Sequence, residues 1–427
     1  MVLSNRDDAD PQEFTGPGEI HFDADGQLQL VLYDRDYAVD LRRLFPSGTS
    51  GDWLPRSELF ELTATDLGGT VWAAHNLRPD TSAHVDRRGA VVRAEIQTMA
   101  TEGQPDREGK DWVWLYFAER IDTPANVNTI TTIQESDQEL PRKGFERNVW
   151  AIASGDLQIR VRRGDAGFEV NALGEKGGIR AGLDTRLEEA LWFSLGQPLT
   201  ADVVQYRLGD RSGVIVHSRG RSERLPTAVA PYSTGMVDSA QVLADILCKY
   251  LEYVRQYGEQ RFHPLSVLIR RQLRARGGTI EERALALSVA IEGVLHHGFE
   301  SIGEPEAIIL NAVSKLEALL EDHLKSSVLK DRVEGFLRAV ARPNPRTALR
   351  TLAARGVVTD QQVDAWERLR HVAAHGKEHE LPFRELYQMS QHLMVLLHAL
   401  VFDLIGYRGP YTDYGARGWP TRRSPDA

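Results

Sequence analysis

The stretch Thr359-Asp-Gln-Gln-Val-Asp-Ala-Trp-Glu-Arg-Leu-Arg-His-Val-Ala-Ala-His-Gly376 sets the expected fold of the second half of this chain. Thr359 and Gln362 have the spacing of a capping box, which predicts that a helix begins here. Gly376 predicts the end of that helix, because glycine readily adopts the left-handed conformation of a helix end. The helix would carry Arg370 and His375, a permanent cation and a group that titrates near neutrality.

The same reasoning predicts helices on both sides of this segment. Thr279 and Glu282 form a second capping box, which opens a helix that runs to Gly298. Apolar periodicity predicts further helices over 305–323, 330–341 and 346–355, and a last helix that starts at Pro382. We therefore expect an all-α bundle over 239–408, followed by a C-terminal tail over 409–427.

The first half of the chain has the pattern of strands and turns. Leu28, Leu30 and Leu32 alternate with polar neighbours, and residues 112–117 have the composition of a buried strand. Many short strands separated by glycine-rich breaks predict an antiparallel β-rich domain over 15–235, either a sandwich or a barrel, with one helix near 185–195. Residues 1–14 are polar, and we expect them to be disordered. The predicted fold class is α+β multidomain.

Composition is that of an ordinary globular protein of 427 residues, with 42% hydrophobic and 26% charged residues. The single cysteine, Cys248, excludes a disulfide framework and a multi-cysteine zinc site. Residues 1–10 lack the apolar core of a signal peptide, and the apolar run 393–405 is too short to span a bilayer. We therefore expect a cytoplasmic protein without a membrane partner.

The formal net charge of −10 argues against broad, nonspecific binding of nucleic acid. A local basic stretch nevertheless lies between residues 260 and 280, and this stretch contains no acidic residue. This stretch is either the solvent-exposed face of a helix or a surface that binds RNA, and the sequence leaves both interpretations open. The candidate RNA-binding residues are Arg270, Arg271 and Arg274 in this stretch, together with Arg368 and Lys377 beside the candidate site.

Arg370 and His375 together are suited to breaking an RNA phosphodiester without a metal. The guanidinium can hold negative charge that develops on phosphorus, and the imidazole can move protons at physiological pH. Simpler roles remain open at this point. A histidine at a helix end can meet the last carbonyl groups, and Arg370 can pair with Glu367 or Glu378.

The segment 359–376 resembles the signature helix of the HEPN superfamily, which carries an Arg, a polar residue, a few further positions and a His. Arg370, His371 and His375 match those three positions. The stretch 404–414, Leu-Ile-Gly-Tyr-Arg-Gly-Pro-Tyr-Thr-Asp-Tyr, is similar to the end of HEPN domains in the ApeA-like group of anti-phage proteins. The resemblance implies a HEPN domain with its core at 278–408.

The resemblance also implies an activity. HEPN ribonucleases let the ribose 2′-hydroxyl attack its own phosphate, which leaves 2′,3′-cyclic phosphate and 5′-hydroxyl ends without a metal or other cofactor. The catalytic residues would be Arg370, His375 and His371, in a homodimer paired through its HEPN domains. ApeA-like proteins are similar to toxins of abortive infection that cut tRNA or other RNA, and this implies a β-rich sensor domain for a phage-derived trigger.

Two other functions fit the sequence. The first is a non-catalytic module, in which a β-rich recognition domain is joined to a HEPN dimerisation bundle. The second is a metal hydrolase that uses His371, His375 and His379, which are spaced four residues apart. Gly376 argues against the metal site, because a helix that ends there does not align the third histidine with the first two.

Overall fold

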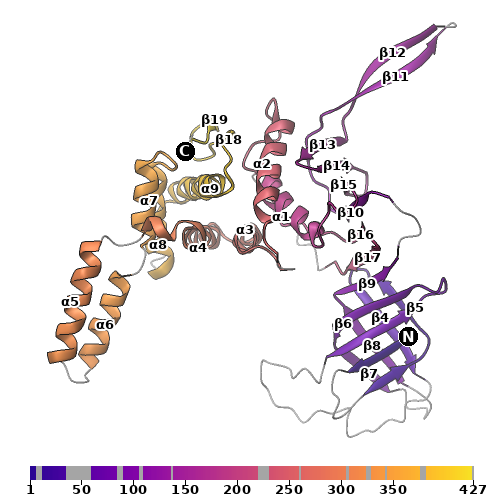
Figure 1. The fold of residues 1–427 in the computed structure, drawn as a ribbon, viewed down its shortest axis with the longest axis horizontal. Coiled ribbons are helices and arrows are strands. Elements are labelled where there is room, and N and C mark those ends of the chain that lie inside the picture. The colour runs from indigo at the N-terminus through magenta and orange to yellow at the C-terminus, as the bar shows by residue number, and fades with distance from the viewer. Residues whose placement is uncertain are drawn as a thin grey trace. The chain divides into compact units, whose positions relative to one another are not determined.

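The computed structural model divides the chain into two compact units (Figure 1): residues Met1–Asp184 with Thr200–Arg224, and residues Thr185–Leu199 with Leu225–Ala427. It describes residues 1–425 except for 6–11, 35–58, 84–89, 105–108, 136–137, 220–229, 259–260, 304–306, 324–327, 342–343 and 376–380. Inside the described elements, some positions are described by their backbone alone: 81–83, 90, 128–135, 138–145, 276, 322–323, 328, 339 and 371–375.

The first unit is built from antiparallel strands. Its larger sheet has the spatial order β13-β14-β15-β10-β16-β17-β9-β6-β5-β1-β2. The bounds of these strands are β1 Val2–Asn5, β2 Glu13–Thr15, β5 Phe60–Thr65, β6 Val71–Leu77, β9 Thr98–Gly103, β10 Asp111–Phe117, β13 Val149–Ser154, β14 Leu157–Arg163, β15 Phe168–Gly174, β16 Val203–Leu208 and β17 Arg211–His217.

A second sheet packs on part of the first. Its order is β3-β4-β8-β7, with bounds Gly18–Phe22, Leu28–Asp34, Ala90–Ile96 and Pro79–Ala83. Leu30 on β4 and Leu62 on β5 are buried in the core that the two sheets share, as the alternating pattern of β4 requires. A separate hairpin joins β11 (Val127–Glu135) to β12 (Gln138–Glu146). The prediction of an antiparallel β-rich first half is confirmed.

The prediction that residues 1–14 are disordered is wrong where the structure describes them. β1 pairs with β2 and also with β5, so the chain start is part of the large sheet. Leu3 and Phe14 are both buried in the core of the unit. Two apolar side chains, well separated in a polar segment, are enough to fix it once backbone hydrogen bonds to β5 are available.

The second unit is helical, as predicted. Its helices are α1 Leu183–Leu195, α2 Ser239–Val254, α3 Pro264–Arg274, α4 Ile280–Gly298, α5 Ala307–His323, α6 Val328–Val340, α7 Pro345–Ala354, α8 Asp360–His375 and α9 Phe383–Ile405, with short 3₁₀ turns over Ala275–Gly277 and Glu300–Gly303. α9 contacts α2, α4 and α8 and forms the centre of the packing. Both capping boxes are present, at Thr279 and at Thr359.

Most of α1 belongs by its contacts to the helical unit, whereas the sequence placed this helix inside the β-rich domain. The ring of Phe193 lies 5.0 Å from that of Tyr250 on α2 and 5.9 Å from that of Phe402 on α9. These contacts join positions more than 50 residues apart, so local pattern could not predict them. The predicted domain boundary therefore needs correction at α1.

α9 is long and apolar enough, by length and composition alone, to cross a membrane. However, 83% of its apolar window is buried within the protein, and a core helix passes the same test. The chain after α9 forms a small hairpin of β18 (Pro410–Thr412) and β19 (Thr421–Arg423). The backbone N–H of Thr412 donates to the carbonyl of Pro231, which ties the predicted tail to the segment before α2.

A buried polar cluster holds α1 against the start of α3. The guanidinium of Arg186 lies 2.6 Å from the carboxylate of Glu189, which also accepts a hydrogen bond from the backbone of His263. Nδ1 of His263 accepts from the N–H of Leu265 and caps α3, so this nitrogen carries no proton. Burial lowers the pKa of His263 to about 4, with smaller contributions from the charges of His297 and Arg186. The groups that face its ring include Arg186, Tyr253, Tyr257 and His297.

Within this cluster, His263 predicts a loss of stability on acidification. The unfolded chain takes up a proton at His263 near its ordinary pKa of 6.5, whereas the folded chain stays neutral there until about pH 4. The free energy of unfolding should therefore fall between pH 6.5 and pH 4, by at most about 1.4 kcal/mol per pH unit for this group. Denaturant unfolding of wild type and His263→Asn, which keeps a cap acceptor, should show a shallower slope in the variant. Equal slopes would contradict the assignment.

Candidate active site

Helix α8 carries the candidate residues, and its capping box fixes where it begins. The N–H of Gln362 donates to the hydroxyl of Thr359 at 3.3 Å, and the side chain of Gln362 accepts from the N–H of Thr359 at 2.9 Å. Val363, Trp366 and Leu369 recur at helical spacing and are buried. This buried face leaves Arg370 at the flank of the helix, next to the core.

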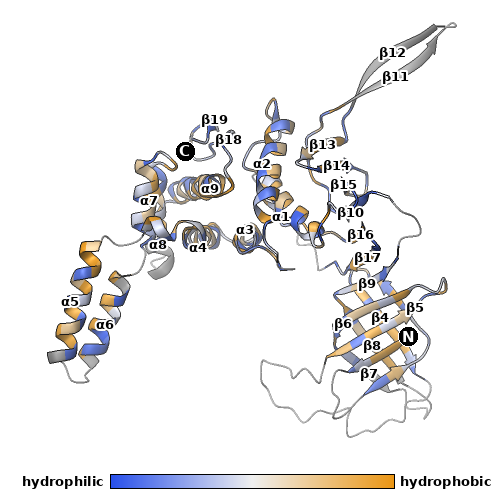
Figure 2. Ribbon diagram, in the orientation of Figure 1, coloured by the Kyte–Doolittle hydropathy of each residue, from blue (hydrophilic) through white to orange (hydrophobic). Residues whose placement is uncertain are grey.

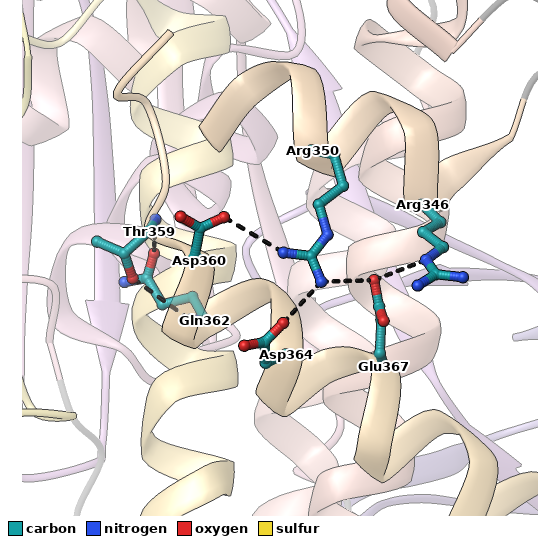
Figure 3. Close-up of polar contacts among 7 residues, drawn as sticks. All are labelled: Arg346, Arg350, Thr359, Asp360, Gln362, Asp364 and Glu367. Atoms are coloured by element: carbon teal, nitrogen blue, oxygen red, sulfur yellow. Dashed lines mark hydrogen bonds and ion pairs between the residues drawn. The ribbon is translucent and has the colours of Figure 1, made fainter. Parts of the chain in front are cut away.

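A network of ion pairs fixes α7 on α8 (Figure 3). Arg350 reaches Asp360 at 3.2 Å, Asp364 at 2.6 Å and Glu367 at 3.1 Å. Arg346 reaches the same oxygen of Glu367 at 2.9 Å. The hydrogen bond to Asp364 raises the pKa of Arg350 above its ordinary value. Two arginines of α7 thus occupy Glu367, which was one of the two expected partners of Arg370.

Arg370 instead pairs with Glu292 on α4. Its Nε lies 2.6 Å from a carboxylate oxygen of Glu292, and the side chain of Arg370 keeps 47% of its surface exposed. The guanidinium carbon lies 5.2 Å from the ring centre of Trp366, the distance of a cation–π contact. Arg370 is therefore oriented by a carboxylate and an aromatic face while it still meets solvent.

The neighbouring candidate Arg368 points to a different helix. It donates to Glu385 at the start of α9, at 2.8 Å, and both side chains are exposed. Such an exposed pair contributes about 0–1 kcal/mol, so a phosphate can displace it at little cost. Arg368 and Arg370 are each held by one carboxylate, on α9 and α4 respectively.

The other members of the candidate set are described only in part. The backbone of α8 is helical through His371 and ends at His375, while their side chains lie outside the described residues. Lys377, Glu378 and His379 also lie outside them. Among the described residues there is no group of three side chains that could hold a metal ion. The three-histidine metal site is therefore untested.

Backbone geometry limits how Arg370 and His375 can cooperate. Five helical residues correspond to about 7.5 Å along the axis and about 140° around it. His371 and His375, four residues apart, share a face of α8, while Arg370 lies well to one side of it. Along one copy of α8, position 370 and the two histidine positions therefore lie on different faces of the helix.

The basic stretch on α3 divides into two kinds of residue. Arg270 is half-buried, and its guanidinium carbon lies 4.9 Å from the ring centres of both Trp192 and Phe262. Burial lowers the pKa of Arg270, and the charge of Arg274 adds to this. Arg271 and Arg274 are exposed in the last turn of α3. Arg271 and Arg274 are therefore accessible to solvent, whereas Arg270 has a packing role against two aromatic rings.

Sequence reasoning missed Glu292 and Trp366 as parts of the site. Glu292 is one of several acidic residues on predicted helices, and no local signal links it to a position 78 residues later. Trp366 is four residues before Arg370, and this spacing places two side chains on the same helix face. The aromatic support of Arg370 was therefore predictable from spacing, whereas its carboxylate partner was not.

Comparisons with models of known families, with curated proteins and with solved structures find no match. The chemical groups on α8 and its neighbours are therefore the basis for a functional proposal. The strongest element of that geometry is an exposed guanidinium on a buried indole, on the same helix as two histidines.

The capping box predicts a local effect on α8. Thr359→Ala removes the hydroxyl that accepts from Gln362, and this should lower the free energy of unfolding by about 1 kcal/mol. Hydrogen exchange should become faster in the first turns of α8. Thr279→Ala removes the matching cap of α4 and should destabilise the unit by a similar amount without faster exchange in α8. Unchanged exchange in α8 of Thr359→Ala would show that packing alone holds this end.

Proposed function

We propose that this chain is a metal-independent endoribonuclease of the HEPN type. The observation that carries the proposal is the state of Arg370, which is half-exposed, supported by the ring of Trp366, and on the same continuous helix as His371 and His375. A guanidinium binds phosphate oxygens in its own plane, and an aromatic face below it keeps that plane fixed. The resemblance of residues 359–376 to the HEPN signature supports the same function.

The proposed reaction is transesterification within RNA. The 2′-hydroxyl loses its proton to a general base and attacks the adjacent phosphorus, while the bond from phosphorus to the 5′-oxygen breaks. A general acid protonates that oxygen, so the products are a 2′,3′-cyclic phosphate and a 5′-hydroxyl. His375 serves as base or acid, a role worth about 10²–10⁴-fold in rate. Arg370 stabilises the charge of the phosphorane, and His371 positions the phosphate.

The reaction requires two proton-transfer groups on opposite sides of one phosphate. One copy of α8 separates Arg370 from His375 by about 140° around the helix, so two copies related by a two-fold axis supply a more complete set. We therefore place the active site between two copies of the helical unit. A two-fold axis also brings two guanidiniums to the cleft, which concentrates positive charge in a chain of net charge −10.

The proposed biological role is that of a toxin that acts in abortive infection. A cleft between two copies suits a single-stranded, unstacked phosphate such as the one in a tRNA anticodon loop. The β-rich unit is then the sensor for a phage-derived trigger. The formal net charge of −10 fits an enzyme that engages RNA at one defined place and not along its whole surface.

A second candidate function is a non-catalytic dimerisation module. One observation favours it: Arg370 already has a partner, since Glu292 lies 2.6 Å from its Nε. An arginine whose only role is to join α8 to α4 would form the same ion pair. The two functions differ in what happens when that ion pair is removed. If the pair is structural, its removal lowers the stability of the fold. If Arg370 is a phosphate site, removal of Glu292 raises its affinity for RNA.

The activity is tested with purified full-length chain, total tRNA and EDTA. Wild type should produce fragments with 5′-hydroxyl and 2′,3′-cyclic phosphate ends, because the proposed chemistry needs no metal. Arg370→Ala and His375→Ala should each lower the cleavage rate by at least about 100-fold. Gel analysis with end-specific labelling gives both rates and end chemistry, and a DNA of the same sequence should remain intact.

Arg355→Ala is the matched control, because Arg355 is also an exposed arginine and lies at the end of α7. Its rate should equal that of wild type. Cleavage that EDTA abolishes would favour the three-histidine metal site. Cleavage that persists in Arg370→Ala, or an inactive wild type with intact fold, would overturn the proposed activity.

The Glu292–Arg370 pair gives a separate prediction. Glu292→Gln removes the carboxylate charge that competes with phosphate, and a half-exposed pair is worth at most about 1 kcal/mol. The affinity for a short single-stranded RNA should therefore rise by about 2–5-fold. Fluorescence anisotropy in a His375→Ala background measures this without cleavage. Glu252→Gln, which releases Lys249 on α2 instead, is the comparison; equal gains in the two variants would mean that Arg370 is not a specific phosphate site.

A further inference from the structure

Helices α5 and α6 form a hairpin that stands apart from the rest of the helical unit (Figure 1). The two helices contact one another, and this contact buries Val313 of α5 and Leu337 of α6. Two short helices of 17 and 13 residues with so small a common core are marginal on their own. The hairpin therefore needs a further apolar partner.

The outer face of α6 is apolar. Leu329, Val333, Phe336 and Val340 recur with spacings of four, three and four residues, which is one face of a helix. Phe336 is 67% exposed, and Leu329 and Val340 are exposed too. This stripe lies beside the one that carries Leu337 and faces α5. α6 thus presents two adjacent apolar faces, of which one is covered.

The outer face of α5 has the same property. Ile308, Ala312, Leu316 and Leu319 form an arc that continues to Val313 and spans about 140° of the helix. Only the edge at Val313 is buried, while Ile308 is 73% exposed and Leu316 and Leu319 are exposed as well. Figure 2 shows the apolar colour along both helices of the hairpin.

The area of this surface is close to what a stable interface uses. The exposed large apolar residues of the hairpin are Ile308, Ile309, Leu310, Leu316, Leu319, Leu329, Phe336 and Val340. About half exposed on average, they present on the order of 700 Å² of apolar surface, at roughly 150–200 Å² for a full large side chain. Monomeric proteins rarely expose contiguous apolar patches above a few hundred Å², and a standard interface buries about 800 Å² per partner.

The charges of the two helices point to the occupant. α5 holds one lysine and three carboxylate residues, so its formal charge is −2, while α6 holds three basic and two acidic residues, for a formal charge of +1. Each helix therefore suits the other helix of a second hairpin better than a copy of itself. Two hairpins related by a two-fold axis place α5 of one chain against α6 of its partner at both contacts.

We propose that the α5–α6 hairpin is a dimerisation arm, which pairs with the same hairpin of a second copy to form a four-helix bundle. The bundle buries the two outer stripes as its core, and α5 and α6 of opposite charge alternate around it. The inference rests on apolar area and charge, so it holds whether or not α8 is catalytic.

The experiment measures the mass of the full chain by light scattering and sedimentation equilibrium. Wild type should have twice the chain mass at micromolar concentration. Phe336→Glu and Leu316→Glu should each raise the dimer dissociation constant by at least about 30-fold, because each places a charge in the centre of the bundle. Phe336→Leu keeps an apolar side chain and should stay dimeric. Circular dichroism of each variant checks that the helices remain.

Val289→Glu is the matched control, since Val289 is also an exposed apolar residue on a helix, α4, of the same unit. It should remain dimeric. A monomeric wild type would overturn the proposal, as would a dimer that survives Phe336→Glu or one that Val289→Glu alone dissociates. Sedimentation of a monomeric wild type with lipid vesicles would show that the apolar face meets a membrane instead. RNA cleavage does not enter this readout. A dimer that survives Phe336→Glu would overturn the arm and leave the nuclease proposal standing, whereas a monomeric wild type would count against both.

Discussion

The burial of one indole holds the candidate site together. Trp366 is 1% exposed, and its ring is both part of the core beneath α8 and the platform under the guanidinium of Arg370. Its Nε1–H has no hydrogen-bond partner among the described residues, which makes its burial more costly than that of a phenylalanine. The area of the ring offsets this cost, and its electron-rich face supports a cation. The side chain of Trp366 thus both positions the guanidinium of Arg370 and stabilises its charge.

The ion pairs around α8 are of two kinds: a network that joins α7 to α8, and a single pair that leaves Arg370 partly exposed. On the α7 side, Arg350 meets three carboxylates of α8, and one of them, Glu367, is shared with Arg346. On the α4 side, Arg370 meets the single carboxylate of Glu292. A half-exposed single pair is worth at most about 1 kcal/mol, whereas a charge-assisted bond to phosphate contributes about 1.5–3 kcal/mol. In the proposed function, a phosphate bound at Arg370 would therefore compete with Glu292 without disturbing how α7 and α8 pack.

Local chemistry was enough to predict where helices begin, and tertiary contacts decided the rest. Thr359 with Gln362 is a four-residue signal, and the structure has that capping box where the sequence placed it. Arg270 shows the opposite case. It lies in a basic stretch, yet the rings of Trp192 and Phe262, one of them 78 residues away, enclose its guanidinium. Composition identifies charge, but burial by distant aromatic rings is a property of the packed unit.

Two independent features of the helical unit call for a second copy. Helix geometry puts about 140° between Arg370 and His375 on α8, which a single phosphate bridges poorly within one chain. The hairpin of α5 and α6 exposes on the order of 700 Å² of apolar surface, which a lone chain would leave in water. The proposed two-fold axis would bury this apolar surface and would also bring two copies of α8 together. A proposed arm that pairs away from α8 would leave the space between the two α8 helices free to open.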